Sequence, residues 1–287
     1  MISGAQSKIH IVMAADGPYL KGLEVTKASM VESCSAPGQL EFHIYREDAV
    51  PGERLRSEFG TYRGSPMAFL RLCLGELLPD VDWVVYSDVD TLWHRDVCEL
   101  WTLRDETKTI QWVRSTPFEF LGWCRERNVP LDESAPERYG CSGVCLMNLK
   151  RWRESRALQR CMDFAKRYGI PKYADQDIMN AVLSVECGLL PEHWDVQIPS
   201  PENTPDCVLH FTGVGQYFSA PYAGRIAQYR YWDHVARGSE IGRIHALPFY
   251  LRPWMVRFLL PFASPLFRER VQRNFAWRWF VARYAHP

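Results

Sequence analysis

Short apolar runs that recur along the chain constrain its fold more than any other feature. Residues 10–15, 41–45, 83–87 and 143–148 each form a run of five or six residues, rich in apolar side chains and bounded by polar or turn-forming ones. Such runs are typical of buried strands, and segments with helical spacing separate them. Strands that alternate with helices predict an α/β fold in which helices cover both faces of a mostly parallel sheet.

The remaining elements follow the same pattern. Helical spacing indicates helices at 19–31, 52–59, 67–78, 149–168 and 175–183, and apolar runs indicate strands at 110–113 and 209–211. Residues 115–139 carry Pro117, Gly122 and Pro130 and are predicted to form a loop. The length suits one large domain, which we place at residues 1–240, followed by a helical tail at 241–287.

Carboxylates follow two of the predicted strands directly. Asp16 comes after the first strand, and Asp88 and Asp90 come after the strand at 83–87. In parallel α/β sheets, ligands bind beyond the carboxyl ends of the strands. We therefore expect these three side chains along one rim of the sheet, although more than 70 residues separate the first from the others.

The pair Asp88 and Asp90 is the strongest chemical signal in the sequence. Two carboxylates one residue apart, at the mouth of a buried strand, supply the hard oxygen ligands that Mg²⁺ and Mn²⁺ prefer. A bound cation also relieves the repulsion between them. The alternative is that the two aspartates only end the strand and begin a turn, but the apolar strand before them favours the metal site.

The same pair admits a second chemistry. Asp88-Val-Asp-Thr-Leu also resembles the nucleophile motif of haloacid-dehalogenase phosphatases, in which the first aspartate attacks phosphorus and the second acts as acid and base. That family carries the motif on its first strand and a Gly-Asp-x-x-x-Asp loop later. Here two predicted strands precede the motif and no such loop follows, so the phosphatase is the less favoured alternative.

Six motifs occur in one order between residues 9 and 220. They are His10-Ile-Val-Met-Ala-Ala-Asp-x-x-Tyr, Arg71-Leu-Cys-Leu-Gly-Glu, Asp88-Val-Asp, Ser142-Gly-Val-Cys-Leu-Met-Asn-Leu-Lys-Arg-Trp, Asp175-Gln-Asp-Ile-Met-Asn and His210-Phe-x-Gly. Each motif alone is weak, but six in register are specific. Together they resemble family 8 glycosyltransferases, retaining enzymes with the GT-A fold, a Rossmann-like domain that binds nucleotide sugars.

The resemblance implies which residues bind the donor, a UDP-sugar, and its metal. The positions that match donor-binding residues of the family are Ala14, Asp16, Tyr19, Arg71, Asp88, Val89, Gly213 and Gln216. Asp88, Asp90 and His210 match the metal ligands, and an imidazole beside two carboxylates suits Mn²⁺, with Mg²⁺ as the alternative. Without the resemblance, His210 would be interpreted as a structural histidine. For Arg71, the alternative to contact with the donor is an ion pair on a helix surface.

The resemblance places Asp175 and Gln176 at the donor sugar as the catalytic residues. Because an amide oxygen is a poor nucleophile, we favour same-face attack, in which the acceptor hydroxyl enters as UDP leaves, over covalent glycosylation of Gln176. The metal would stabilise the departing diphosphate. The implied reaction moves a hexose, galactose or glucose, to a hydroxyl of a glycan or glycolipid in lipopolysaccharide or another cell-surface glycan.

Two positions depart from the family pattern. Gln216 stands where the family commonly has a lysine that pairs with the diphosphate, which predicts weaker donor binding unless another cation such as Arg225 substitutes. Cys141 stands where the family has an asparagine that contacts a hydroxyl of the donor sugar. The second departure leaves the identity of the sugar open.

The net charge of zero hides two unlike parts. Residues 241–287 carry eight arginines and one acid, interleaved with aromatic side chains, whereas residues 1–240 carry 26 basic and 33 acidic residues. Arginine with tryptophan suits an anionic membrane surface, so we expect a cytoplasmic enzyme held on the inner face of the cell membrane, with no nucleic-acid partner. Two alternatives for the tail are that it folds back on the domain or that its aromatic side chains stack on RNA. The alternative for the whole protein is a non-catalytic scaffold at the membrane.

The nine cysteines show no spacing of a zinc site, and several lie in apolar runs. We therefore expect reduced thiols in a cytoplasmic protein. The N-terminal apolar run is too short for a signal peptide, and no run reaches the length of a membrane-spanning helix.

Overall fold

The computed structural model describes residues 8–16, 19–46, 52–62, 64–117, 119–197 and 206–211. The predictions for Gly213, Gln216, Arg225 and the tail at 241–287, as well as the domain boundary near residue 240, lie outside the described residues.

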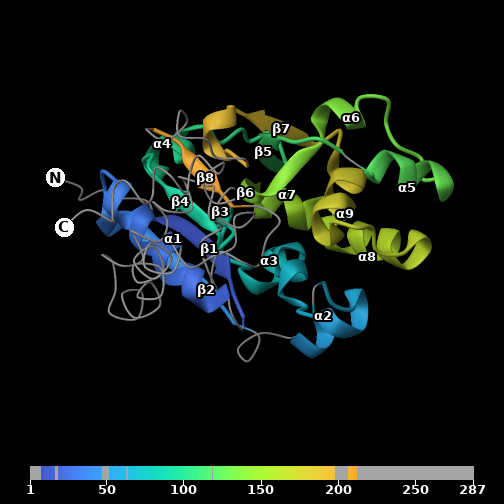
Figure 1. The fold of residues 1–287 in the computed structure, drawn as a ribbon, viewed down its shortest axis with the longest axis horizontal. Helices are drawn as coiled ribbons and strands as arrows, with labels where there is room; N and C mark the ends of the chain where they lie inside the picture. Colours follow the sequence, from blue (N-terminus) through green and yellow to red (C-terminus); the bar gives the residue numbers. More distant parts are fainter. Residues whose placement is uncertain are drawn as a thin grey trace, which may run out of the picture.

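A mixed sheet of six strands forms the centre of the described part, in the order β2-β1-β3-β6-β5-β7 (Figure 1). Five strands share one direction, whereas β6 is antiparallel to its neighbours β3 and β5. The prediction of a mostly parallel sheet is confirmed, with β6 as the reversed strand. The strands are β1 (Ile9–Ala14), β2 (Leu40–Tyr45), β3 (Trp83–Ser87), β5 (Ile110–Arg114), β6 (Gly140–Asn148) and β7 (Cys187–Leu190).

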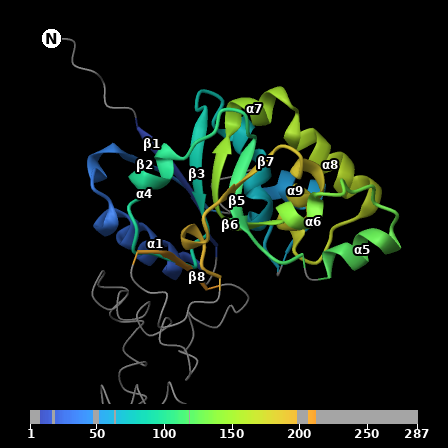
Figure 2. The same cartoon turned by 90° about the horizontal axis from the view of Figure 1, so that it is seen from above.

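Helices cover both faces of the sheet, as Figure 2 shows. On one face lie α1 (Leu20–Ser33), α4 (Val97–Thr102), the 3₁₀ turn η5 (Glu192–Trp194) and a small antiparallel sheet of β4 (Thr91–Trp93) and β8 (Val208–His210). On the other lie α2 (Gly52–Phe59), η4 (Met67–Cys73), α3 (Leu74–Leu77), α7 (Leu149–Glu154), α8 (Ala157–Tyr168) and α9 (Ala174–Leu183). Because both faces are covered, every residue of β3 and β6 is buried.

The structure differs from the prediction in five segments, two of which are β4 and β7, strands at positions where the sequence indicated none. The helix predicted at 149–168 is broken into α7 and α8, because Arg156 adopts a left-handed conformation with φ 53°. The loop predicted at 115–139 contains α5 (Phe120–Glu126) and α6 (Ala135–Arg138). The first part of the helix predicted at 67–78 is the 3₁₀ helix η4, and a short turn, η2 (Pro37–Gln39), precedes β2.

The start of β6 packs against β5 without space for a side chain. A Cβ built on Gly140 would lie 2.0 Å from Cδ1 of the Trp112 ring, well inside van der Waals contact. Trp112 is fully buried, and its indole N–H donates to the Arg138 carbonyl at 3.1 Å. The ring therefore has no open space into which it can retreat.

We expect Gly140→Ala to lower the free energy of unfolding by about 1–3 kcal/mol, the usual cost of overpacking a close-packed core. Urea denaturation followed by tryptophan fluorescence measures this loss. Gly122→Ala in α5 is the matched control, because its added Cβ would meet nothing within 4 Å. The explanation is wrong if the two variants are equally stable.

Candidate functional site

A cavity of about 360 Å³ opens at the carboxyl ends of β1 and β3. The expectation that Asp16 and the Asp88–Asp90 pair share one rim is confirmed, because all three line it. Every described residue that the sequence proposed for the site lies in its lining: Ala14, Asp16, Tyr19, Arg71, Asp88, Val89, Asp90, Asp175, Gln176 and His210.

Arg71 is a buried cation in the lining of the cavity. Its Nη2 lies 2.8 Å from Asp88 Oδ1 and its Nε lies 2.8 Å from Asp175 Oδ2. Nη1 donates to the Ser142 carbonyl, and the guanidinium stacks on the Tyr86 ring at 4.1 Å. The reading of Arg71 as a helix-surface ion pair is wrong, since only 4% of the residue is exposed.

Burial and the neighbouring charges shift the pKa values of Arg71 and of its two carboxylate partners. Burial alone would lower the pKa of Arg71, but Asp175 and Asp88 raise it well above its ordinary value. Burial raises the pKa of Asp175 to about 6 in spite of the opposing charge of Arg71. Burial likewise raises the pKa of Asp88, with Arg71 opposing it and Asp90 adding to it.

His210 lies between two groups of carboxylates. Its Nε2 is 3.2 Å from Asp90 Oδ1 and 3.7 Å from Asp88 Oδ2, while its Nδ1 is 2.8 Å from Asp195 Oδ1. Burial alone would lower the pKa of His210, but Asp195 and Asp90 outweigh burial and raise it well above its ordinary value. The imidazole is therefore held in a fixed orientation, with Nε2 directed at the aspartate pair.

Backbone pairing and one glycine place this histidine. In the small antiparallel sheet, His210 of β8 pairs with Thr91 of β4, which follows Asp90 directly, and the Phe211 amide donates to the Asp90 carbonyl at 2.9 Å. A Cβ on Gly143 would lie 2.0 Å from Cε1 of the ring. Only a glycine leaves His210 in this position.

The residues present fit a divalent cation. One ligand atom from each of Asp88, Asp90 and His210 falls within 4.8 Å of the others. Asp195 holds the second nitrogen of the imidazole, as a carboxylate does behind many metal-bound histidines. Three protein ligands leave positions for the oxygens of a bound phosphate group.

Gln176 is fixed at both ends of its side-chain amide. Its Nε2 donates to the Tyr139 hydroxyl at 2.9 Å, and its Oε1 accepts from the Ser142 amide at 3.1 Å. The Tyr139 hydroxyl donates in turn to Asp177 Oδ1 at 2.5 Å. The orientation of Gln176 is thus set by this hydrogen-bond chain.

Cys141 is the residue that departs from the family pattern within the described site. It is buried, lines the cavity, and has its Sγ 3.7 Å from His210 Nδ1. Burial raises the pKa of this thiol to about 12, so it stays a neutral, small side chain. All nine cysteines of the chain are described, and each is a free thiol in the structure.

The sequence motifs did not predict three residues that support the site. Asp195 follows η5, where no motif marks it, and its contact with His210 spans 15 residues. Tyr139 lies in the segment predicted as a loop. Asp177 belongs to the Asp175-Gln-Asp motif, but its position two residues from Asp175 gave no hint that it binds Tyr139.

The described lining of the cavity holds more carboxylates than cationic side chains. Its described lining includes four carboxylates, from Asp16, Asp88, Asp90 and Asp175, against the cations of Arg71 and a protonated His210. Both cations already contact carboxylates within the site. An anionic ligand would therefore meet net repulsion in the described cavity unless a cation entered with it.

The sequence of the chain matches a known protein family. The sequence model of glycosyl transferase family 8 matches residues 54–214. The chain is 27% identical to a putative glycosyltransferase of Haemophilus influenzae over 40% of this chain and 34% of that one. It is 21% identical to probable galacturonosyltransferase-like 7 of Arabidopsis thaliana over 73% of this chain and 70% of that one. It is 26% identical to glucoside xylosyltransferase 2 of Mus musculus over 65% of this chain and 51% of that one. The chain thus covers about a third of the Haemophilus relative and half of the mouse relative.

Solved structures share the fold. A crystal structure of galactosyltransferase LgtC in complex with donor and acceptor sugar analogs superposes with a TM-score of 0.66 at 19% identity, over 83% of this chain and 100% of that one. A crystal structure of glycosyltransferase GlyE of Streptococcus pneumoniae superposes with a TM-score of 0.60 at 17% identity, over 86% of this chain and 64% of that one. The predicted GT-A fold is confirmed.

We expect Arg71→Met to lower the free energy of unfolding by about 3 kcal/mol, because it leaves the carboxylates of Asp88 and Asp175 without their partner. Loss of Arg71 also removes the charge that lowers the pKa of Asp175, so that pKa rises above about 6. A carboxyl with a raised pKa in the folded state stabilises it only at low pH. The destabilisation should therefore be larger above about pH 6 than below it.

Urea denaturation in the presence of a chelator at several pH values tests both points. Arg54→Met is the control, because Arg54 forms an exposed pair network with Glu58 and Glu76 that is worth at most about 1 kcal/mol. The buried-pair interpretation is contradicted if Arg71→Met lowers the free energy of unfolding no more than the control does. It is also contradicted if the decrease is the same at every pH.

Proposed function

This chain belongs to glycosyltransferase family 8, and we propose that it transfers a hexose, galactose or glucose, from a UDP-sugar to a hydroxyl of a glycan or glycolipid, with retention at the anomeric carbon. Relatives of this family and fold generally use a divalent metal and UDP-sugar donors. Both a galactosyltransferase in complex with donor and acceptor sugar analogs and a glucoside xylosyltransferase are similar to this chain.

One observation carries the proposal: the aspartate pair and His210 converge on one point in a cavity with an excess of carboxylates. A nucleoside diphosphate is anionic and would be repelled there unless a divalent cation is present. Mn²⁺, or Mg²⁺, held by Asp88, Asp90 and His210 would neutralise the diphosphate and stabilise it as the leaving group. The excess of carboxylates in the described lining thus supports a divalent metal at this site.

The proposed roles follow the positions of the side chains. Ala14 ends β1, Asp16 follows it and Tyr19 precedes α1. These residues would bind the uracil together with Val89, which lines the same cavity. Arg71 would fix the carboxylates of Asp88 and Asp175 by its two ion pairs. Gly213 and Gln216 would contact the donor phosphates from the segment after β8.

Gln176 and Asp175 would face the donor sugar from the first turn of α9. The amide of Gln176 is held by Tyr139 and Ser142, so it can hydrogen-bond to the sugar in one orientation. The negative charge of Asp175 is balanced by its ion pair with Arg71, and this pairing makes the carboxylate a poor nucleophile. Both points support same-face attack, in which the acceptor hydroxyl loses its proton to the departing phosphate oxygen, and no side chain becomes glycosylated.

The phosphatase alternative is replaced by the family assignment. Its nucleophile would be Asp88, yet Oδ1 of that residue is paired with Arg71. The substitution of Cys141 for the family's asparagine leaves galactose and glucose as alternative donors. The neutral thiol can give only a weak contact to a sugar hydroxyl.

The acceptor side of the proposal depends on the tail. We propose that residues 1–240 form the catalytic domain and that residues 241–287 bind an anionic membrane surface, where a lipid-linked glycan would serve as acceptor. The enzyme would then act on the inner face of the cell membrane, in lipopolysaccharide or another cell-surface glycan. A non-catalytic scaffold at the same membrane is the alternative.

Among the described helices, none combines the length and apolar character needed to cross a bilayer.

We expect UDP to stabilise the protein only when Mn²⁺ is present. At concentrations about 100-fold above the dissociation constant, the melting temperature should rise by about 5–10 °C. The double variant Asp88→Asn, Asp90→Asn should lose this rise, while Asp163→Asn, an exposed carboxylate on α8, should keep it. An equal rise without metal, or in the double variant, would remove the metal site from the proposal.

We expect the triple variant Arg268→Gln, Arg270→Gln, Arg273→Gln to bind vesicles of anionic lipid about 100-fold more weakly than the natural chain. Each arginine near such a surface contributes about 1 kcal/mol. Vesicle co-sedimentation measures the change, and the stabilisation by UDP with Mn²⁺ should persist. The charge-matched control replaces the exposed Arg125, Arg127 and Arg167 of the domain. Equal vesicle binding by both triple variants would contradict a role of the tail.

A further inference from the structure

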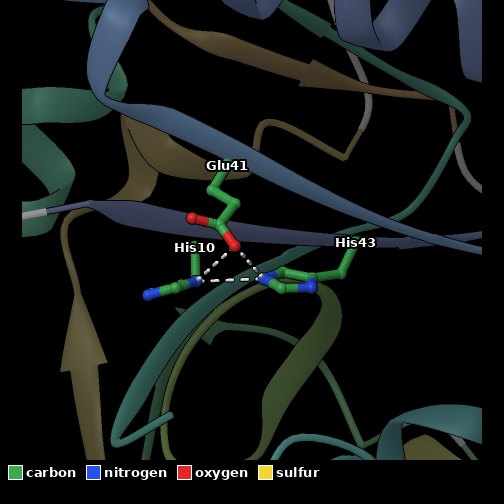
Figure 3. A group of neighbouring side chains, drawn as sticks. All are labelled: His10, Glu41 and His43. Carbon is green, nitrogen blue, oxygen red and sulfur yellow. Dashed lines mark hydrogen bonds and ion pairs between the residues drawn. The ribbon is translucent and has the colours of Figure 1, made fainter.

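A second group of metal-ligating side chains lies on the two strands at one edge of the sheet. His10 of β1 and Glu41 and His43 of β2 point toward one another (Figure 3). His10 Nδ1 is 2.9 Å from His43 Nε2, and Glu41 Oε1 is 4.0 Å from the first nitrogen and 3.9 Å from the second. Three potential ligand atoms from three side chains therefore form a compact triangle.

The sheet itself creates this triangle. β1 and β2 are parallel, with His10 paired to Glu41 and Val12 paired to His43. Residues two apart on one strand share a face, so Glu41 and His43 stand on the same side of β2. The directly opposed residue of the neighbouring strand, His10, completes the set, and its diagonal neighbour His43 lies within reach of a long side chain.

The spacing suits a tetrahedral ion. Ligand atoms about 2.0–2.1 Å from zinc in a tetrahedral site lie about 3.3 Å from one another. The three separations in the structure, 2.9, 3.9 and 4.0 Å, lie on either side of that value. Movements of less than about 1 Å would bring all three atoms to bonding distance, with the fourth position left to water.

The donor set selects the kind of ion. Two imidazoles and one carboxylate suit Zn²⁺ and other late first-row divalent ions, whereas Mg²⁺ and Ca²⁺ prefer oxygen ligands alone. Burial, with His10 adding to it, lowers the pKa of His43, so this ring is neutral and able to bind a metal at neutral pH. The side chains are 23%, 46% and 18% exposed for His10, Glu41 and His43, so an ion can reach them from solvent.

This group is separate from the cavity. None of its three residues lines the cavity, which begins at Ala14, four residues further along β1. At about 3.3 Å per residue, that distance along the strand is about 13 Å. An ion here would not contact a ligand bound at Asp88 and Asp90.

We propose that His10, Glu41 and His43 form a second metal site, which binds Zn²⁺ or a similar late first-row divalent ion with water as the fourth ligand. The ion fastens β2 to β1. Because β2 is the edge strand of the sheet and pairs with β1 alone among the described strands, a cross-strand link there holds a strand that lacks a second neighbour.

Co²⁺ is the probe, because its visible absorption intensifies in tetrahedral coordination. The full chain carrying Asp88→Asn and Asp90→Asn is titrated with Co²⁺, so that the aspartate pair of the cavity does not contribute. Zn²⁺ affinity is measured by competition with a coloured chelator. We expect one tetrahedral Co²⁺ per chain. His43→Gln and, separately, Glu41→Gln should weaken binding at least about tenfold, the scale on which altered ligand environments act.

His193→Gln is the matched control, because His193 is a partly buried histidine outside the group and should leave Co²⁺ binding unchanged. Hydrogen exchange provides a second readout: Zn²⁺ should slow exchange of the β2 amides in the parent and not in His43→Gln. Glu41→Gln changes an exposed side chain and keeps the test valid if His43→Gln fails to fold. Absence of a tetrahedral spectrum, or equal affinity in the parent, Glu41→Gln and His193→Gln, would overturn the proposal.

Discussion

The two ion pairs of Arg71 are the interaction on which the rest of the site depends. The guanidinium joins Asp88 after β3, Asp175 at the start of α9 and the Ser142 carbonyl in β6, three elements that are far apart in the sequence. Desolvating an arginine is costly unless its partners are placed well, and here two carboxylates, a carbonyl and the Tyr86 ring surround it. The position of α9 relative to the sheet is thereby coupled to the electrostatics of the cavity.

The reversed strand β6 serves the same site in a second way. Because β6 runs against β3, its first residues lie beside the end of β3, and the Gly143 carbonyl accepts the Asp88 amide at 2.7 Å. The absence of a side chain at Gly143 leaves room for the His210 ring, which Asp195 holds from behind. One strand therefore positions the aspartate pair through its backbone and His210 through its lack of a side chain.

The sequence predicted the site better than the connections around it. Motif residues such as Asp88 and Gln176 lie at strand ends and helix starts, where local pattern and function coincide, and the structure brings them into one cavity. The reversal of β6, the left-handed Arg156 and the contact of Asp195 with His210 depend on tertiary packing, which leaves no periodic signal. The triangle of His10, Glu41 and His43 was missed for the same reason, since it arises only from the register of two strands.

The charge of the cavity also indicates what the replacement of a lysine by Gln216 would change. Arg71 is cationic, but it already contacts the carboxylates of Asp88 and Asp175, so its charge is not free for a diphosphate. His210 adds no positive charge once it binds the metal, because a metal-bound imidazole is neutral. In a family member with a lysine at the position of Gln216, metal and lysine would share the neutralisation of the departing diphosphate. In this chain the metal would carry more of that charge, unless a cation such as Arg225 replaces the lysine. Donor binding by this chain should therefore depend more steeply on the metal than in relatives that keep the lysine.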